Sequence, residues 1–490
     1  MKALKSLIFC LITFIGVNSF AVAAPLSQQP AGPVRYVKPG GTGNCISWET
    51  ACDLQYALDL ANPSDTNPIV NIWVASGTYT PTNTTNRALT FRLESGVGIY
   101  GGFPGTGGGW ISRDWVNNIT TLNGDIGTPG NSDDNSYHVV AANAVDATAI
   151  LDGFTITGGN ANVSGNLTGG GLYNLNSNPT LMNLIISNNV AELNGGGMYN
   201  NNSSPALTNV TFSENSSTEI GSYGGGMHNY LSEPTLLNVT FSNNSATYGG
   251  GMVNDYSNSV LMNLTFTGNV ATGAAGAIIN YNSNPTLINV TFLGNLAANF
   301  GGGMVNAYSH PTLTNVTFSG NSTFESGSYG GGIFNSWSNP MLTNVTFTGN
   351  SASGVGSEGG AIYSEDSSPT LTNAIVWGNT PPSNQIVGIR TGTTIITFSD
   401  IQGAAVYPGL GNINSDPLLG SLANNGGFVK THALPFGSYA IDTGSSAVCQ
   451  TTDARGFPRP IDGDDDGSEI CDMGAYEFDF LRLYLPLVVK

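Results

Sequence analysis

Apolar and polar residues alternate with a period of two in short segments through the middle of the chain. In the stretch Asn-Val-Thr-Phe that ends at Phe318, Val316 and Phe318 fall on one side of an extended backbone and Thr317 on the other. Residues 311–313 and 303–306 supply two more such segments in the same repeat. This alternation, with β-branched and aromatic residues, is typical of β-strands. We therefore expect three short strands per repeat, separated by Gly, Asn or Ser.

The alternating segments recur with a nearly constant period. A Phe-x-x-Asn motif, with variants at Ile186 and, in the last copy, with Trp377 beside Asn379, places an asparagine every 25 to 29 residues. These asparagines are Asn160, Asn189, Asn215, Asn244, Asn269, Asn295, Asn321, Asn350 and Asn379. A second motif, Gly-Gly-Gly-Met-x-Asn or a variant of it, ends 15 residues before each of the last eight. Insertions are thus confined to one loop per repeat, as stacked coils require.

We therefore predict an all-β protein: a right-handed single-stranded parallel β-helix with about 26–29 residues per coil and capped ends. Stacking at about 4.8 Å places like residues above one another. We expect a Phe column, Leu and Val columns, and two Asn columns whose amides hydrogen-bond along the stack. Residues 24–168 are the expected N-terminal cap and opening coils, with a short plug helix at 53–61. Residues 169–379 are the regular repeats, and 380–480 are expected to close the far end.

The start of the chain predicts export. Two lysines precede an apolar run from Leu7 to Val17, and small residues follow up to Ala23. This pattern is that of a signal peptide, residues 1–23, cleaved near Ala23. The sequence contains no other segment apolar enough to span a membrane as a helix. We expect a secreted or cell-surface protein, in which the apolar tail 481–490 is either an edge strand on the cap or a signal for sorting or anchoring.

Four cysteines follow the predicted signal peptide: Cys45, Cys52, Cys449 and Cys471. An even number in an exported chain predicts disulfide bonds. Cys45 with Cys52 and Cys449 with Cys471 are the local pairings, and the sequence leaves the other two connectivities open.

The charge distribution narrows the range of partners. The formal net charge is −19, and no Lys or Arg occurs between Arg113 and Arg390. Nucleic acids and anionic membranes attract proteins through basic patches. We therefore expect neither to be a partner of this chain.

Several motifs resemble those of known families. Gly-Gly-Ala-Ile at 359–362, together with the Phe-x-x-Asn series, makes residues 150–380 similar to polymorphic outer membrane proteins, whose passengers are surface adhesins. The flanks resemble secreted β-helix proteins of the choice-of-anchor Q type. The matching residues are Tyr36-Val37, Cys45, Cys52, the run Ile72–Tyr79, Asp453-x-Arg455-Gly456-x-x-Arg459-Pro460 and Asp472-x-Gly474-Ala475-Tyr476-Glu477. Both resemblances imply an extracellular or surface location, and the second brings no catalytic residue.

Two functions are compatible with these patterns. The first is an adhesive or structural binding module whose nearly uncharged lateral face presents Ser, Thr, Asn and Tyr to glycans or partner proteins. The alternative is a polysaccharide lyase or glycoside hydrolase with a site in the opening coils, where Asp114, Asp125, Asp133 and Asp134 are the candidate acids.

The repeats themselves offer little for such an enzyme. Lyase chemistry needs a base, often Arg or Lys, and the repeats contain neither. A glycosidase needs two carboxyls roughly 5–9.5 Å apart. Asp255 and Glu365 are expected in one column but four coils apart, which is too far. We expect His228 and His310 to be surface residues. Taken together, these features of the repeats favour a binding module over an enzyme.

One segment has the spacing of a calcium loop. Asp462, Asp464 and Asp466 occupy positions 1, 3 and 5, and a glycine occupies position 6. The usual Glu at position 12 is absent, so Glu469 or Glu477 would have to replace it. The segment is interpreted either as a calcium site, calcium being the one cofactor considered, or as a solvated acidic turn.

Overall fold

The computed structural model describes residues 28–61 and 70–480. The predicted signal peptide and the apolar tail lie outside the described residues. The chain divides into residues 1–30 and 31–490, and the features below belong to the second unit. No helix within the described ranges is both long and apolar enough to cross a membrane.

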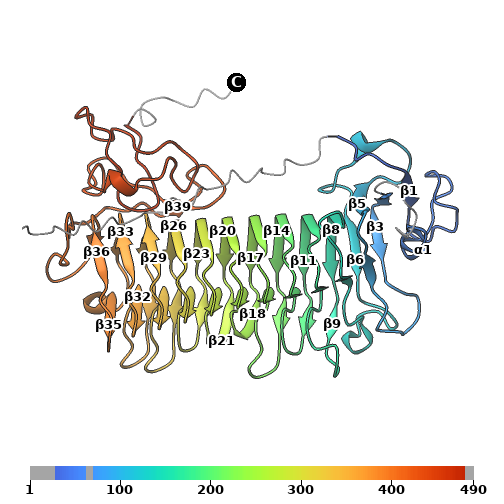
Figure 1. Ribbon diagram of the computed structural model, residues 1–490, viewed down its shortest axis with the longest axis horizontal. Helices are drawn as coiled ribbons and strands as arrows, with labels where there is room; N and C mark the ends of the chain where they lie inside the picture. The colour runs from blue at the N-terminus through green and yellow to red at the C-terminus, as the bar shows by residue number, and fades with distance from the viewer. Residues whose placement is uncertain (1–27, 62–69, 481–490) are drawn as a thin grey trace, which may run out of the picture. The chain divides into compact units, whose positions relative to one another are not determined.

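Strands of successive coils pair in parallel and form three sheets along the stack (Figure 1). Sheet 1 has 18 strands. They are β1 (Val34–Val37), β2 (Val70–Ala75), β3 (Gly77–Tyr79), β5 (Val97–Phe103), β6 (Thr120–Asn123), β8 (Ile150–Thr157), β11 (Thr180–Ser187), β14 (Ala206–Ser213), β17 (Thr235–Ser242), β20 (Val260–Thr267), β23 (Thr286–Leu293), β26 (Thr312–Ser319), β29 (Met341–Thr343), β30 (Thr346–Thr348), β33 (Thr370–Thr372), β34 (Ile375–Trp377), β36 (Ile395–Thr397) and β37 (Asp400–Ile401).

Sheets 2 and 3 have 11 and 8 strands. Sheet 2 contains β4 (Phe91–Leu93), β7 (Val140–Asn143), β10 (Leu172–Leu175), β13 (Met198–Asn201), β16 (Met227–Tyr230), β19 (Met252–Asp255), β22 (Ile278–Tyr281), β25 (Met304–Ala307), β28 (Ile333–Ser336), β32 (Ile362–Glu365) and β35 (Ile386–Ile389). Sheet 3 contains β9 (Asn160–Ala161), β12 (Val190–Ala191), β15 (Ser216–Ser217), β18 (Ser245–Tyr248), β21 (Val270–Ala274), β24 (Leu296–Ala297), β27 (Ser322–Thr323) and β31 (Ser351–Ala352).

The remaining elements are short. The antiparallel pair β38 (Leu422–Ala423) and β39 (Thr431–His432) lies in the C-terminal segment. The helices are α1 (Leu54–Leu60) and the 3-10 turns η1 (Trp110–Ser112), η2 (Ser132–Asp134), η3 (Pro382–Asn384) and η4 (Ser446–Val448).

Like residues lie on top of one another, as predicted. Phe241 of β17 pairs with Phe266 of β20, which pairs with Phe292 of β23. Their ring centroids are 4.8 and 5.1 Å apart, with planes within 2° and 8° of parallel. All three rings are fully buried. Face-to-face stacking is not the preferred geometry of isolated rings, so the spacing of the backbone ladder imposes it. The all-β parallel β-helix is confirmed.

The predicted asparagine columns are also confirmed. The Oδ1 atom of Asn269 accepts hydrogen bonds from the backbone N–H and Nδ2 of Asn244, at 3.1 and 3.0 Å. Nδ2 of Asn269 donates to the Phe241 carbonyl of the previous coil, at 2.9 Å. In the second column, Nδ2 of Asn254 donates to Oδ1 of Asn280, at 2.9 Å. These side chains are completely buried, so each column satisfies polar groups that water cannot reach.

A third asparagine ladder was not predicted. It runs along sheet 1, where Nδ2 of Asn263 donates to Oδ1 of Asn238 at 3.1 Å and Nδ2 of Asn289 donates to Asn263 at 3.0 Å. The backbone of these residues is left-handed, with φ between 55° and 60°. Asparagine tolerates this conformation better than other side chains with a Cβ atom, which explains its recurrence.

The N-terminal end is closed as expected. α1 begins after Asp53, whose carboxylate accepts the backbone N–H of Gln55 at 2.9 Å. This N-cap satisfies a donor that the helix leaves unpaired. Leu54, Ala57 and Leu58 are buried and join the core of the coils. The predicted plug helix is confirmed.

The C-terminal segment differs from expectation. Residues up to about 413 close the far end, where Ile396 and Ile401 join the core and Tyr407 packs against it. The following residues lie along the outer face of sheet 1 (Figure 1). Their contacts are Thr291 Oγ1 to the Lys430 carbonyl (2.8 Å), His432 Nε2 to Ser319 Oγ (3.0 Å) and the Ala475 N–H to Thr346 Oγ1 (3.1 Å).

This lateral packing corrects two expectations. Residues 380–480 do not serve only as an end cap, because the part after 413 covers several coils from the side. Thr317 points away from the core as predicted, but it is only 1% exposed. It pairs with Thr291 and Thr346 of the neighbouring coils. The small hydroxyl side chains of this column offer hydrogen-bonding groups to a covering segment, and periodicity alone cannot reveal such a cover.

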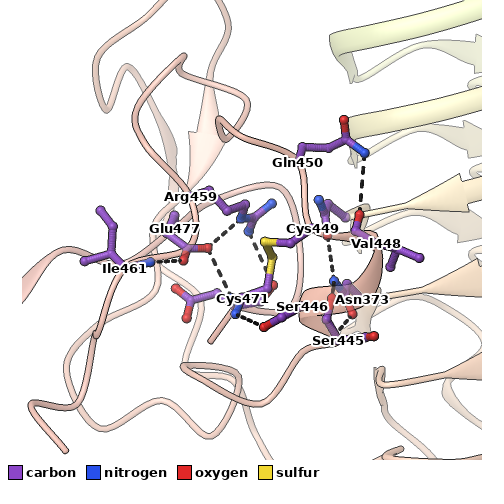
Figure 2. Close-up of a disulfide and its surroundings, with 12 residues drawn as sticks. Asn373, Ser445, Ser446, Val448, Cys449, Gln450, Arg459, Ile461, Cys471 and Glu477 are labelled. Atoms are coloured by element: carbon purple, nitrogen blue, oxygen red, sulfur yellow. Dashed lines mark hydrogen bonds and ion pairs between the residues drawn. A yellow bond between two sulfur atoms is a disulfide. The ribbon is translucent and has the colours of Figure 1, made fainter. Parts of the chain in front are cut away.

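The C-terminal segment is held by a disulfide and buried ion pairs. Cys449 pairs with Cys471 and Cys45 with Cys52, which are the two local pairings. Close to the first disulfide, Arg459 Nε lies 2.5 Å from Glu477 Oε2 with both side chains fully buried (Figure 2). The two C-terminal motifs noted in the sequence therefore pack against each other.

Candidate functional site: an aromatic groove on sheet 2

A groove of about 520 Å³ lies on the outer face of sheet 2. Alternate residues of a strand point to opposite faces, so in β16 the side chains of Met227 and Asn229 enter the core while those of His228 and Tyr230 face out. Further rings come from Tyr223, in the turn before β16, and from Tyr248, the last residue of β18. The lining residues are Asn194, Tyr199, Tyr223, His228, Tyr230, Tyr248, Val253, Asp255, Ile279 and Tyr281. Five of them are tyrosines from different positions of four successive coils.

The rings in the groove contact one another along the stack. Tyr223 and Tyr248 are stacked with centroids 5.2 Å apart. His228 lies 5.4 Å from Tyr199 and 5.8 Å from Tyr223. Tyr199 continues toward the N-terminal coils through Tyr173, at 5.9 Å. Packing between neighbours restricts these rings, so the groove keeps its shape without a ligand and binding loses little side-chain entropy.

His228 corrects a sequence-based expectation. It was expected on the surface, but it is 5% exposed. None of the described residues provides a hydrogen-bond partner for either ring nitrogen. Burial lowers the pKa of His228 to about 3, so the ring is neutral at physiological pH. Its strand position does point outward, and Tyr199 and Tyr223 cover it. His310 is exposed as expected.

Asp255 is the one carboxylic acid among the residues that line the groove. Burial raises its pKa, and its Oδ1 atom has no hydrogen-bond partner among the described residues. As predicted, Asp255 shares a column with Glu365 four coils away. Glu365 pairs with Arg390 instead. The groove therefore lacks the carboxyl pair that glycoside hydrolysis requires.

The candidate acids of the opening coils do not line the aromatic groove. Asp114 accepts the backbone N–H groups of Val116 and Asn117, each at 3.1 Å. Hydrogen bonds from Asn117 lower the pKa of Asp114. Asp125 accepts the Gly130 N–H, Asp134 accepts the Thr128 N–H, and Asp133 is exposed. Three of these four carboxylates thus brace the turns in which they lie.

The tyrosines of the groove were recognised in the sequence only as part of a polar lateral face. Aligning the coils on their Met-x-Asn positions places Tyr199 and His228 in one column and Tyr230, Asp255 and Tyr281 in another. That alignment is a signal that could have located the groove. Tyr223 and Tyr248 share a third column, because each directly precedes the Gly-Gly-Gly of its coil.

The carboxylates that gather at the acidic loop differ from the set expected from the sequence. Carboxylate oxygens of Asp462, Asp464 and Asp442 lie within 4.8 Å of one another. Asp466 is not in this group, and its backbone N–H donates to Asp462 Oδ1 at 3.2 Å. Burial raises the pKa of Asp442 to about 6. Calcium binding stays a prediction, with Asp442 as a candidate ligand in place of Asp466.

We predict that the full chain binds calcium with a dissociation constant on the order of 10⁻³ M, the weak range of extracellular modules. Asp442→Asn should weaken binding at least about tenfold, because it removes the charge of a half-buried carboxylate from the group of three. Asp465→Asn, in the same loop but outside the group, is the matched control. Isothermal titration measures both, and an unchanged heat of binding for Asp442→Asn would contradict this ligand assignment.

Comparison with known proteins agrees with the fold. Residues 170–373 match the family model described as right handed beta helix region, which confirms the predicted hand of the coil. No curated protein matches the chain. Among solved structures, the pectate lyase Pel9A aligns over 91% of this chain and 96% of its own, with 12% identity and a TM-score of 0.45. PfbA, a surface adhesin of Streptococcus pneumoniae, aligns over 71% and 88%, with 10% identity and a TM-score of 0.26.

The chain is therefore an all-β protein built on a right-handed parallel β-helix, with a C-terminal segment packed on sheet 1 and an aromatic groove on sheet 2.

Proposed function

We propose that this protein is an exported surface module that binds glycans or partner proteins through the aromatic groove on sheet 2. The main observation in support is the set of five tyrosines that share this groove with a buried, neutral His228. Tyrosine combines a large apolar face with a hydroxyl that can bond to a polar partner, and it is enriched at binding surfaces. Two disulfides support an extracellular location, because they persist in oxidising compartments.

A binding role is favoured over catalysis by the composition of the groove. Its lining contains one carboxyl group and no Lys or Arg. Acid–base cleavage of a glycosidic bond needs a second carboxyl, and elimination from an acidic sugar needs a base and a cation. Tight binding of a ligand needs no second carboxyl, base or cation. It needs a groove of complementary shape, aromatic surface and a few polar groups.

The test is a binding screen of the full chain on neutral and acidic polysaccharides and on extracellular matrix proteins. Tyr223→Ala and Tyr248→Ala should each weaken binding at least about tenfold, because each removes a ring from the groove. Tyr439→Ala is the matched control, since Tyr439 is 65% exposed and lies outside the groove. Equal binding by all three variants would overturn the proposal.

The same screen addresses the rival function. Products released from a polysaccharide by the wild type, and lost in Asp125→Asn, Asp133→Asn or Asp134→Asn, would establish an enzyme with its site in the opening coils. Binding without product release supports the surface module.

A further inference from the structure

One column of turns on the edge of sheet 2 has a left-handed backbone in eight successive coils. The residue that follows each strand from β10 to β32 has φ between 47° and 51°. In three coils this residue is asparagine: Asn176, Asn202 and Asn282. In four others it is large and apolar or aromatic: Leu231, Tyr256, Tyr308 and Trp337.

Large side chains are unfavourable at these positions. In the left-handed region the Cβ atom lies too close to the following carbonyl oxygen, and asparagine suffers least because its amide can bond locally. The chain itself provides the comparison. The left-handed column on sheet 1 runs from Asn183 to Asn373 and is asparagine in every coil. The fold therefore does not require Tyr or Trp in the column on sheet 2, and strain of this kind gathers at functional sites.

The aromatic residues of this column form an exposed row. Tyr256, Tyr308 and Trp337 are 52%, 53% and 52% exposed, and Tyr281, at the end of β22, is 42% exposed. Ring centroids of Tyr256 and Tyr281 are 6.2 Å apart, as are those of Tyr281 and Tyr308. Tyr308 and Trp337 follow at 6.4 Å with nearly parallel planes. We call these four residues the aromatic track. It crosses four successive coils and joins the groove at Tyr281.

We propose that the aromatic track binds a linear neutral polysaccharide that lies parallel to the helix axis and continues into the groove. This inference rests on the proposed function and names its ligand class. A row of rings at one ring per coil matches a ligand that repeats along a line. The C–H faces of sugar rings are apolar and slightly positive, so they pack on the negative faces of aromatic rings.

The charges around the track select against acidic sugars. No Lys or Arg occurs between Arg113 and Arg390, so the coils that carry the track provide no cation for a uronate. Beyond Trp337, the next residue of the column is Asp366, which with Glu365 pairs with Arg390. Asp255 adds a further carboxyl beside Tyr256. A polyanionic chain would meet repulsion here, while a neutral chain would not.

The test replaces residues at the strained positions by asparagine, the side chain that a left-handed backbone tolerates best. In the full chain, Tyr308→Asn and Trp337→Asn should leave Tm unchanged or raise it, because the strain at the turn is relieved. The same variants should raise the dissociation constant for a neutral polysaccharide at least about tenfold. Leu231→Asn is the matched control, because it relieves the same strain without removing an aromatic ring. The probes are cellulose, xylan and mannan, with polygalacturonate as the acidic comparison, in affinity electrophoresis or pull-down.

The outcomes separate this inference from the proposed function. Retention on a neutral polysaccharide that is lost in the track variants, and kept in Leu231→Asn, supports the track. Preference for polygalacturonate, absence of binding to all three neutral probes, or full binding by Tyr308→Asn and Trp337→Asn overturns it. If Tyr223→Ala weakens binding while the track variants do not, the groove is the binding site and the track is not. If binding resides in a matrix protein alone, the surface module stands and the glycan assignment fails.

Discussion

Replacing Asn269 by leucine is expected to lower the free energy of unfolding by about 3 kcal/mol or more. Oδ1 of Asn269 is the acceptor for the backbone N–H of Asn244, and its Nδ2 donates to the Phe241 carbonyl. Leucine has a similar volume but leaves the Asn244 N–H buried without a partner and removes a hydrogen bond from the Phe241 carbonyl. Each unsatisfied group costs about 1–3 kcal/mol. The ladder neighbours Asn244 and Asn295 also lose a side-chain partner.

Denaturant unfolding followed by circular dichroism measures this loss. Asn201→Leu is the matched control, because Asn201 is half-buried at the outward end of β13, where water still reaches its side chain. Its effect should stay within about 0.5 kcal/mol, as at other surface positions. Similar unfolding midpoints for the two variants would mean that the buried amide ladder contributes little to stability.

Replacing Arg459 by alanine is expected to destabilise the docked C-terminal segment by about 3–5 kcal/mol, the usual effect of breaking a buried ion pair. Arg459 pairs with Glu477 and donates to the carbonyl oxygens of Gly474 and Tyr476, at 2.9 and 3.1 Å. It also reaches Oδ1 of Asn315 on sheet 1, at 3.3 Å. One side chain therefore links the two C-terminal motifs to the coils.

Hydrogen exchange of amides in residues 414–480 measures the expected undocking. Arg390→Ala is the control, because the Arg390–Glu365 pair is largely exposed on the arginine side and such pairs contribute at most about 1 kcal/mol. Unchanged protection in Arg459→Ala would contradict the assigned role.

The Arg459→Ala effect should also depend on pH. Burial raises the pKa of Glu477 and the Arg459 charge opposes that rise, so the variant should have a still higher Glu477 pKa. A native-state pKa above the unfolded value means that the native state binds more protons, and stability falls as pH rises. The variant should therefore be less destabilised at about pH 5 than at about pH 8.

The prediction of the coils succeeded because the signal is repeated. Each coil contributes the same inward residues, and stacking requires that Phe241, Phe266 and Phe292 meet. A single misread strand would not alter a period supported by nine asparagines. The two local disulfides were among the cysteine pairings expected from the sequence, because cysteines separated by few residues can approach each other in few backbone conformations. The third ladder, represented by Asn263, was overlooked because an asparagine inside a strand counts as an ordinary polar position in the alternation, and its left-handed backbone is not visible in the sequence.

The candidate site was predicted less well, for a physical reason. His228 has an outward strand position, and its burial depends on Tyr199 of the previous coil and on Tyr223 of the turn before its own strand. Thr317 is likewise outward and becomes buried under a segment more than a hundred residues later in the chain. The repeat places Tyr199 and His228 in one column, but which outward columns become covered depends on contacts that carry no period in the sequence.

The sequence by itself determined the parallel β-helix, the columns of like residues and the short plug helix, because each follows from local alternation or from a regular repeat. Only the tertiary structure decided where the segment after residue 413 lies, how completely the outward tyrosines enclose His228, and which aspartates approach Asp462. Those features depend on turns of irregular length and on the free energy of packing distant surfaces, and neither is encoded in the spacing of residues along the chain.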